Sequence, residues 1–211
     1  MTTFKCPGQD SRYWTAEDIF DVKCPFCNNE IEFFKDEPFR ICPKCAEEVR
    51  NPRIDLGCAQ WCKFAKKCLG VTDDSDIMLA SMCQRLVVQM QKYFGNNQTD
   101  VDHAMKILRY AEEISKNEPG APLAIRAAAI LYEVDVPEKI MAELDIENDT
   151  IMLVSEIIKD LHTTAELDLP ESKIIHDAVQ LADMKDNEEE KTLITETGRG
   201  LIKKRFPENN K

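Results

Sequence analysis

The chain has 211 residues, of which 43% are hydrophobic and 31% are charged, and its formal net charge is −12. This composition allows one or two folded domains and excludes a collagen or a disordered tail. No apolar stretch approaches the roughly 20 residues that cross a bilayer, and the first residues do not resemble a signal peptide, so we expect a cytoplasmic protein without membrane contact. The negative charge disfavours nucleic acid as a partner.

Cysteines and charges divide the chain into two regions. Eight of the nine cysteines lie between Cys6 and Cys68, and only Cys83 follows them. Residues 1–72 carry 11 basic and 11 acidic side chains, whereas the remainder carries 16 basic and 28 acidic ones. We therefore predict a cysteine-rich, metal-binding module over residues 1–72 and a helical domain over residues 73–211.

Four cysteines in the first region form two C-P-x-C knuckles, Cys24 with Cys27 and Cys42 with Cys45, and fourteen residues separate the knuckles. A reducing compartment disfavours disulfides, so we predict that these thiolates bind one metal ion tetrahedrally. Each knuckle is expected to begin a short β-hairpin. The segment over residues 22–52 resembles a zinc ribbon, which implies zinc at this site, and rubredoxin-type iron is the chemical alternative.

The residue after each knuckle departs from the zinc-ribbon pattern. Glycine is frequent there because the turn takes a left-handed conformation, whereas this chain has Asn28 and Ala46. Asparagine tolerates that conformation, and alanine does so less well.

A second all-cysteine site is predicted from the remaining thiols of the module. Cys58 and Cys62 are one helical turn apart, Cys68 follows, and the distant Cys6 is the candidate for the fourth ligand. This set suits either a second zinc ion or a [4Fe-4S] cluster, and the alternative is a group of buried structural cysteines. Metal would supply folding energy to a module with little apolar core, so a structural role is expected; nucleic-acid contact and redox sensing remain as alternatives.

The second region has helical periodicity almost throughout, without a competing strand pattern. We predict a mainly α fold, in which an all-α domain follows the small metal-bound module with its short β-hairpins. The expected helices begin near residue 76 and then cover residues 99–117, 122–134, 148–162, 170–184 and 188–206.

Polar residues stand at apolar places on three of these helices. His103 shares a stripe with apolar side chains, Glu133 follows the run AAAILY, and Asp177 lies within IIHDAVQLAD. Each alone would be ordinary, because a single histidine on an apolar face is usually a core residue. Together they indicate a candidate site.

These segments, together with His162, are similar to the HD superfamily of metal-dependent phosphohydrolases, over about residues 76–206. The resemblance implies that His103 and Asp177 match the first histidine and the last aspartate of the family's metal site. The His-Asp doublet corresponds here to Tyr132-Glu133, and His162 falls where many members have a further histidine.

The altered doublet decides which function we expect. A neutral phenol is a poor metal ligand and Glu133 is one methylene longer than aspartate, so the site would hold Mg²⁺ or Mn²⁺ weakly at most. We therefore expect an HD-like protein with impaired catalysis and a regulatory or ligand-binding role, whose partner is a phosphorylated small molecule or a protein. The alternative is an active metal-dependent phosphohydrolase that uses a noncanonical site on a nucleotide or another phosphoester, with Arg109 or Arg126 as candidate phosphate clamps.

Overall fold

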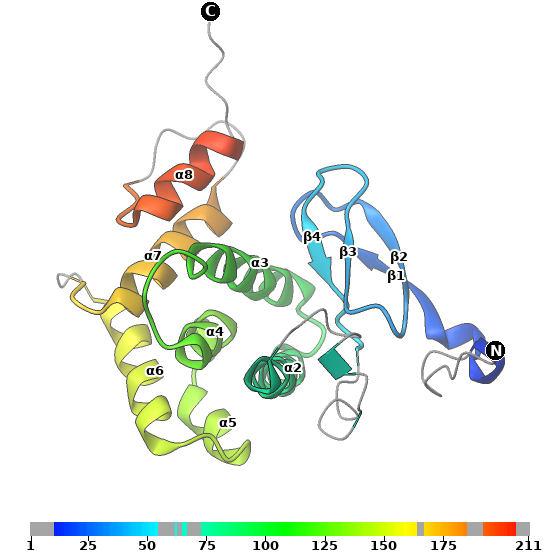
Figure 1. Ribbon diagram of the computed structural model, residues 1–211, viewed down its shortest axis with the longest axis horizontal. Helices are drawn as coiled ribbons and strands as arrows, with labels where there is room; N and C mark the ends of the chain where they lie inside the picture. Colours follow the sequence, from blue (N-terminus) through cyan, green and yellow to red (C-terminus); the bar gives the residue numbers. More distant parts are fainter. Residues whose placement is uncertain are drawn as a thin grey trace, which may run out of the picture. The chain divides into compact units, whose positions relative to one another are not determined.

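The computed structural model describes residues 11–54, 62, 65–66, 73–163, 167–184 and 192–205 (Figure 1). The chain divides into two compact units, residues 1–84 and 85–211, and helix α2 (Asp74–Phe94) contributes to both. The domain boundary expected after Thr72 stays a prediction.

The cysteine-rich unit contains two antiparallel β-hairpins. Strand β1 (Ile19–Lys23) pairs with β2 (Glu30–Phe34), and β3 (Phe39–Ile41) pairs with β4 (Glu48–Arg50). Short 3-10 helices over Ser11–Tyr13 and Ala16–Asp18 precede β1. Each C-P-x-C knuckle forms the turn of its hairpin rather than preceding it, which corrects the expected order.

The knuckle turns have the same backbone geometry. Asn28 N–H donates to the carbonyl of Cys24 over 2.8 Å, and Ala46 N–H donates to the carbonyl of Cys42 over 2.9 Å. The residue after each knuckle is left-handed, with φ of 59° at Asn28 and 61° at Ala46. This conformation reverses the chain directly after the second cysteine, so that both sulfur atoms of a knuckle stay on the inner side of its turn.

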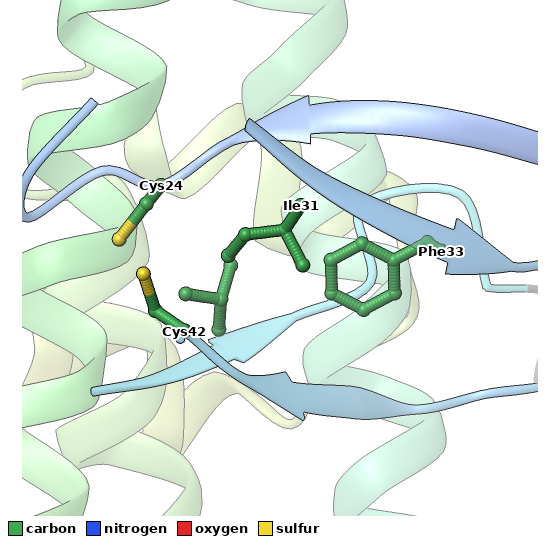
Figure 2. Packing of buried hydrophobic residues seen from close by; sticks show 5 residues of the cluster. Cys24, Ile31, Phe33 and Cys42 are labelled. Carbon is green, nitrogen blue, oxygen red and sulfur yellow. The ribbon is translucent and has the colours of Figure 1, made fainter. Parts of the chain in front are cut away.

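A small core lies between the knuckle cysteines and the sheet residues. Phe33 is 0% exposed, Ile31 and Val49 are each 4% exposed, and the cluster also contains Cys24 and Cys42 (Figure 2). Strand alternation explains why Ile31 and Phe33 are buried together, because residues two apart on a strand point to the same face of the sheet. So few apolar side chains contribute little burial free energy, and the unit therefore depends on a further source of stability.

Buried Asn51 ties the two hairpins together. Its side-chain amide donates to the carbonyls of Phe34 and Glu37 over 3.1 and 2.8 Å, and its side-chain oxygen accepts from Arg53 N–H over 2.8 Å. Asn51 is 1% exposed. These bonds fix the end of the first hairpin against the segment that follows the second.

The remainder of the described chain is helical, which confirms the mainly α fold. The helices after α2 are α3 (Gln98–Ile114), α4 (Pro122–Leu131), α5 (Pro137–Glu143), α6 (Asn148–Leu161), α7 (Pro170–Asp183) and α8 (Glu196–Arg205). Within the described residues, no helix combines the length and apolar character needed to cross a membrane.

Helix α4 is the centre of the helical unit. Its residues 127–131 are all 0% exposed, and it contacts α3, α6 and α7, which surround it in Figure 1. A helix with apolar residues on most of its faces is stable only when neighbours cover those faces, and Arg126 is the one charged residue of α4. The alanines at 127–129 allow these neighbouring helices to approach closely.

Two helices differ from the expectation. Helix α5 was not predicted, because it is a seven-residue segment that begins at Pro137 and offers little periodicity. The last helix begins at Glu196 rather than at Glu188: residues 192–194 are irregular, and residues 185–191 lie outside the described part. Thr195 explains the late start, since its Oγ1 accepts the N–H of Gly198 over 3.0 Å and so caps the helix.

Replacing Ala46 by glycine tests the left-handed turn. A Cβ at positive φ is unfavourable, so Ala46→Gly should raise the free energy of local opening of the β3–β4 hairpin by roughly 0.5–1 kcal/mol. Amide hydrogen exchange of β3 and β4 in the metal-loaded chain measures this. Asn28→Gly is the matched control, and its free energy of local opening should rise less, because asparagine already tolerates the turn. Weaker protection from exchange in Ala46→Gly than in the unchanged chain would contradict the explanation.

Candidate functional site

The two knuckles bring four sulfur atoms together. The Sγ atoms of Cys24, Cys27, Cys42 and Cys45 all lie within 4.8 Å of one another. The Sγ–Sγ distance is 3.6 Å between Cys27 and Cys42 and 3.7 Å between Cys24 and Cys45. A tetrahedral ion with metal–sulfur bonds of about 2.3 Å separates its sulfur ligands by about 3.8 Å. The cluster therefore has the size that a zinc–thiolate centre requires.

The environment of these thiols favours an added cation. Burial raises the pKa of Cys24 and of Cys45 above the ordinary thiol value. Burial opposes ionisation of Cys42 as well, but hydrogen bonds from the backbone N–H groups of Cys45 and Lys44 lower the pKa of Cys42 to about 7. The turn itself thus favours the Cys42 thiolate, whereas the raised pKa values of Cys24 and Cys45 mean that these two thiols need positive charge beside them to ionise near neutral pH.

The donor set fits zinc and also fits iron, because both ions bind four thiolates tetrahedrally. Pro25 and Pro43 lack the backbone N–H, so the amides that can point toward the sulfurs come from the later residues of each knuckle. The four-cysteine cluster is confirmed as a group that could hold a metal; the identity of the ion belongs to the proposal below.

The second cysteine site stays a prediction. Cys62 is a free, partly exposed thiol within the described residues. Its expected partners Cys6, Cys58 and Cys68 lie outside the described residues.

His103 lies between two carboxylates in the helical unit. Its Nδ1 is 2.9 Å from Oε1 of Glu133, and its Nε2 is 2.9 Å from Oδ1 of Asp183. Each ring nitrogen of His103 therefore faces one carboxylate oxygen. The structure thus brings His103 and Glu133 into contact, and their role as metal ligands stays a prediction. It adds Asp183, for which the sequence offers no signal beyond its place at the end of α7.

Asp177 has a different set of contacts. Its side chain is 0% exposed, and it accepts hydrogen bonds from the backbone N–H groups of Ile194 and Thr195 and from Thr195 Oγ1, at 2.6 to 3.1 Å. His176 Nδ1 lies 3.0 Å from the same carboxylate. Burial raises the pKa of Asp177, but these hydrogen bonds more than offset that effect and lower it overall. Asp177 therefore anchors the start of α8.

His162 lies beside Tyr132, one of the two residues that the sequence resemblance set against the His-Asp doublet. The rings of Tyr132 and His162 are stacked, with centroids 5.1 Å apart and planes 11° apart. Burial and then the charges of Asp183 and Glu133 raise the pKa of Tyr132, so the phenol stays neutral. Within the described residues, the four knuckle cysteines are the only group of three or more histidine, cysteine, aspartate or glutamate side chains whose ligand atoms all lie close enough to share an ion.

Comparisons with protein-family models, with curated proteins and with solved structures found no match to this chain. The resemblance to the HD superfamily therefore rests on the sequence motifs alone.

Removing one knuckle thiol tests the metal centre. Cys42→Ser should lose one equivalent of bound metal relative to the unchanged chain, because three thiolates and a hydroxyl hold zinc poorly. Elemental analysis of the dialysed protein measures the change. Cys83→Ser is the matched control, since Cys83 is also buried but lies on α2, and it should keep the full metal content. Equal metal content in both variants would rule out the four-cysteine site.

Removing the charge of Asp177 tests its role at α8. Asp177→Asn should lower the free energy of unfolding by about 2–4 kcal/mol, because buried hydrogen bonds to a charged group are lost. Since the folded-state pKa is lowered, ionised Asp177 stabilises the fold above its unfolded-state pKa, and this contribution disappears as the pH falls through the folded-state value. Urea unfolding between pH 7 and pH 3 should thus show a weaker acid dependence in Asp177→Asn.

Asp183→Asn is the control for that experiment. Asp183 is 45% exposed, and its pair with His103 should contribute at most about 1 kcal/mol. If both variants lose the same small amount, Asp177 does not anchor α8.

Proposed function

We propose that this chain is a zinc-binding regulatory protein whose helical domain has HD-superfamily ancestry but no hydrolytic metal centre. Zinc would lie on Cys24, Cys27, Cys42 and Cys45, where it stabilises the two hairpins. The helical domain would bind a protein partner or a phosphorylated small molecule without hydrolysing it. Free thiols among the described cysteines favour a reducing compartment such as the cytoplasm.

The contacts of Asp177 carry this proposal. A carboxylate that ligates a catalytic ion needs a lone pair directed at that ion, whereas both oxygens of Asp177 accept hydrogen bonds from the chain. The same carboxylate is fully buried. Ligation by Asp177 would require it to release Ile194 and Thr195, and with them the start of α8.

His103 supports the proposal independently. Both of its ring nitrogens face a carboxylate oxygen at 2.9 Å, so an ion would have to take the place of one of these contacts to reach the ring. The two candidate phosphate clamps are also paired: Arg109 with Glu113 over 3.0 Å and Arg126 with Glu112 over 2.8 Å. The carboxylates of Glu133 and Asp183, which lie beside His103, would repel a phosphoester unless a metal ion were bound between them and the phosphate.

The competing function is an active phosphohydrolase with a noncanonical site. Asp183 is the observation in its favour, because it places a second carboxylate beside His103 and Glu133. An ion there would have to displace one carboxylate from the histidine ring. We rank this function second for that reason.

A hydrolase assay tests the proposal. The purified chain should show no turnover of p-nitrophenyl phosphate or nucleotides above the buffer rate with Mg²⁺, Mn²⁺ or Zn²⁺, because the described histidines and carboxylates of the helical unit form no group that could hold an ion to activate water. His103→Ala is the control for contaminating enzymes and should leave any background unchanged. Metal-dependent turnover that disappears in His103→Ala would overturn the proposal in favour of the active phosphohydrolase.

A metal-affinity measurement tests the proposed HD-superfamily ancestry of the helical domain. Tyr132→His combined with Glu133→Asp recreates the family doublet and should raise the affinity for Mn²⁺ in calorimetry, relative to Tyr132→Phe. The phenylalanine variant keeps the stacking on His162 but adds no ligand. Equal affinity in the two variants would count against the residue-by-residue match to the superfamily.

A further inference from the structure

The four knuckle sulfurs differ in exposure in a regular way. In each knuckle the first cysteine is buried and the second is partly exposed: Cys24 and Cys42 are each 1% exposed, whereas Cys27 and Cys45 reach the surface. Figure 2 shows the two buried sulfurs directed toward one another from the two hairpins. A small oxidant in solvent can therefore reach Cys27 and Cys45 before it reaches their knuckle partners.

Each exposed sulfur has a buried sulfur of the other knuckle beside it. Cys27 lies 3.6 Å from Cys42, and Cys45 lies 3.7 Å from Cys24. These pairs are crossed, because each joins the turn of one hairpin to the turn of the other. A disulfide needs the sulfurs about 2.05 Å apart, so each pair would have to close by roughly 1.6 Å.

We propose that the metal centre is a peroxide-sensitive switch, in which Cys27 and Cys45 are oxidised first and the crossed disulfides Cys27–Cys42 and Cys24–Cys45 form as zinc leaves. This inference rests on the proposed function, because it requires zinc on the four cysteines. It assigns to the site a regulation by oxidation in addition to a structural role.

The reaction balances with hydrogen peroxide as the oxidant. The Cys27 thiolate attacks one peroxide oxygen, an S–O bond forms, the O–O bond breaks, and the leaving hydroxide takes a proton to become water. Cys42 then attacks the sulfur of the resulting sulfenic acid, so that the S–S bond forms and a second water leaves. Repeating these steps with Cys45 and Cys24 consumes, in all, two peroxides and four protons, and it releases Zn²⁺ and four waters.

The crossed pairing has a structural consequence. Disulfides within a knuckle would leave the two hairpins held together by noncovalent contacts, such as their small core and the hydrogen bonds of Asn51, whereas crossed disulfides join the knuckles covalently where the zinc had joined them. The oxidised unit should therefore keep Phe33 and its neighbours buried while its metal is lost. A thiol reductant together with zinc should restore the starting state.

The test begins with full-length protein whose zinc content has been measured. Hydrogen peroxide is added, released zinc is followed with a colorimetric chelator, and the remaining thiols are alkylated before digestion with trypsin. Cleavage after Lys23, Lys35, Arg40, Lys44 and Arg50 gives the peptides 24–35, 41–44 and 45–50. Crossed disulfides link peptide 24–35 to both of the others, and fragmentation of the linked species assigns the individual sulfurs.

We expect one zinc released for each centre that forms the two crossed disulfides, with full recovery after reduction and re-addition of zinc. Cys83→Ser is the matched control and should release zinc at the same rate. Peptide 41–44 linked to 45–50 without 24–35, irreversible oxidation without disulfides, or zinc retained at peroxide levels that oxidise free thiols would each overturn the inference. A starting protein that binds no zinc at these cysteines would instead overturn the proposed function.

Discussion

Repulsion among four closely spaced thiolates is the constraint on which the cysteine-rich unit depends. Two unit charges about 4 Å apart repel by about 4 kcal/mol at an effective dielectric constant of about 20, so four thiolates are not stable together without a cation. The left-handed turns at Asn28 and Ala46 nevertheless direct the sulfurs to one point. A divalent ion converts that repulsion into the main attraction between two hairpins that share a core of few apolar side chains.

In the helical unit, carboxylates from distant parts of the chain satisfy the backbone at helix starts. Glu171 Oε1 accepts the N–H of Ala121 at the start of α4 over 2.9 Å, and Glu118 Oε1 accepts the N–H of Thr197 in α8 over 3.0 Å. Asp177 acts in the same way at Thr195. Negative charge at a helix N-terminus is favourable because it meets unpaired N–H groups and the positive end of the helix dipole. These acidic residues therefore serve the fold, which is consistent with a domain that has no hydrolytic metal centre.

The sequence predicts what depends on local spacing. The C-P-x-C spacing predicts the sulfur cluster because each knuckle is a self-contained turn, and apolar periodicity predicts most of the helices because each buries one face. Contacts between distant residues leave no such signal: Glu171 and Ala121 are 50 positions apart, and His103 and Asp183 are 80 apart. The motif around Asp177 likewise predicts a metal ligand, because nothing in its local sequence shows the contacts that Asp177 makes with Ile194 and Thr195, 17 and 18 residues away.

Zinc K-edge X-ray absorption of the full chain, loaded with excess zinc and then desalted, tests the central claim most directly. If the cysteines hold the metal and the helical domain holds none, the first shell contains sulfur alone at about 2.3 Å. A nitrogen or oxygen shell at about 2.0–2.1 Å that is lost in His103→Ala would place zinc in the helical domain and contradict the account.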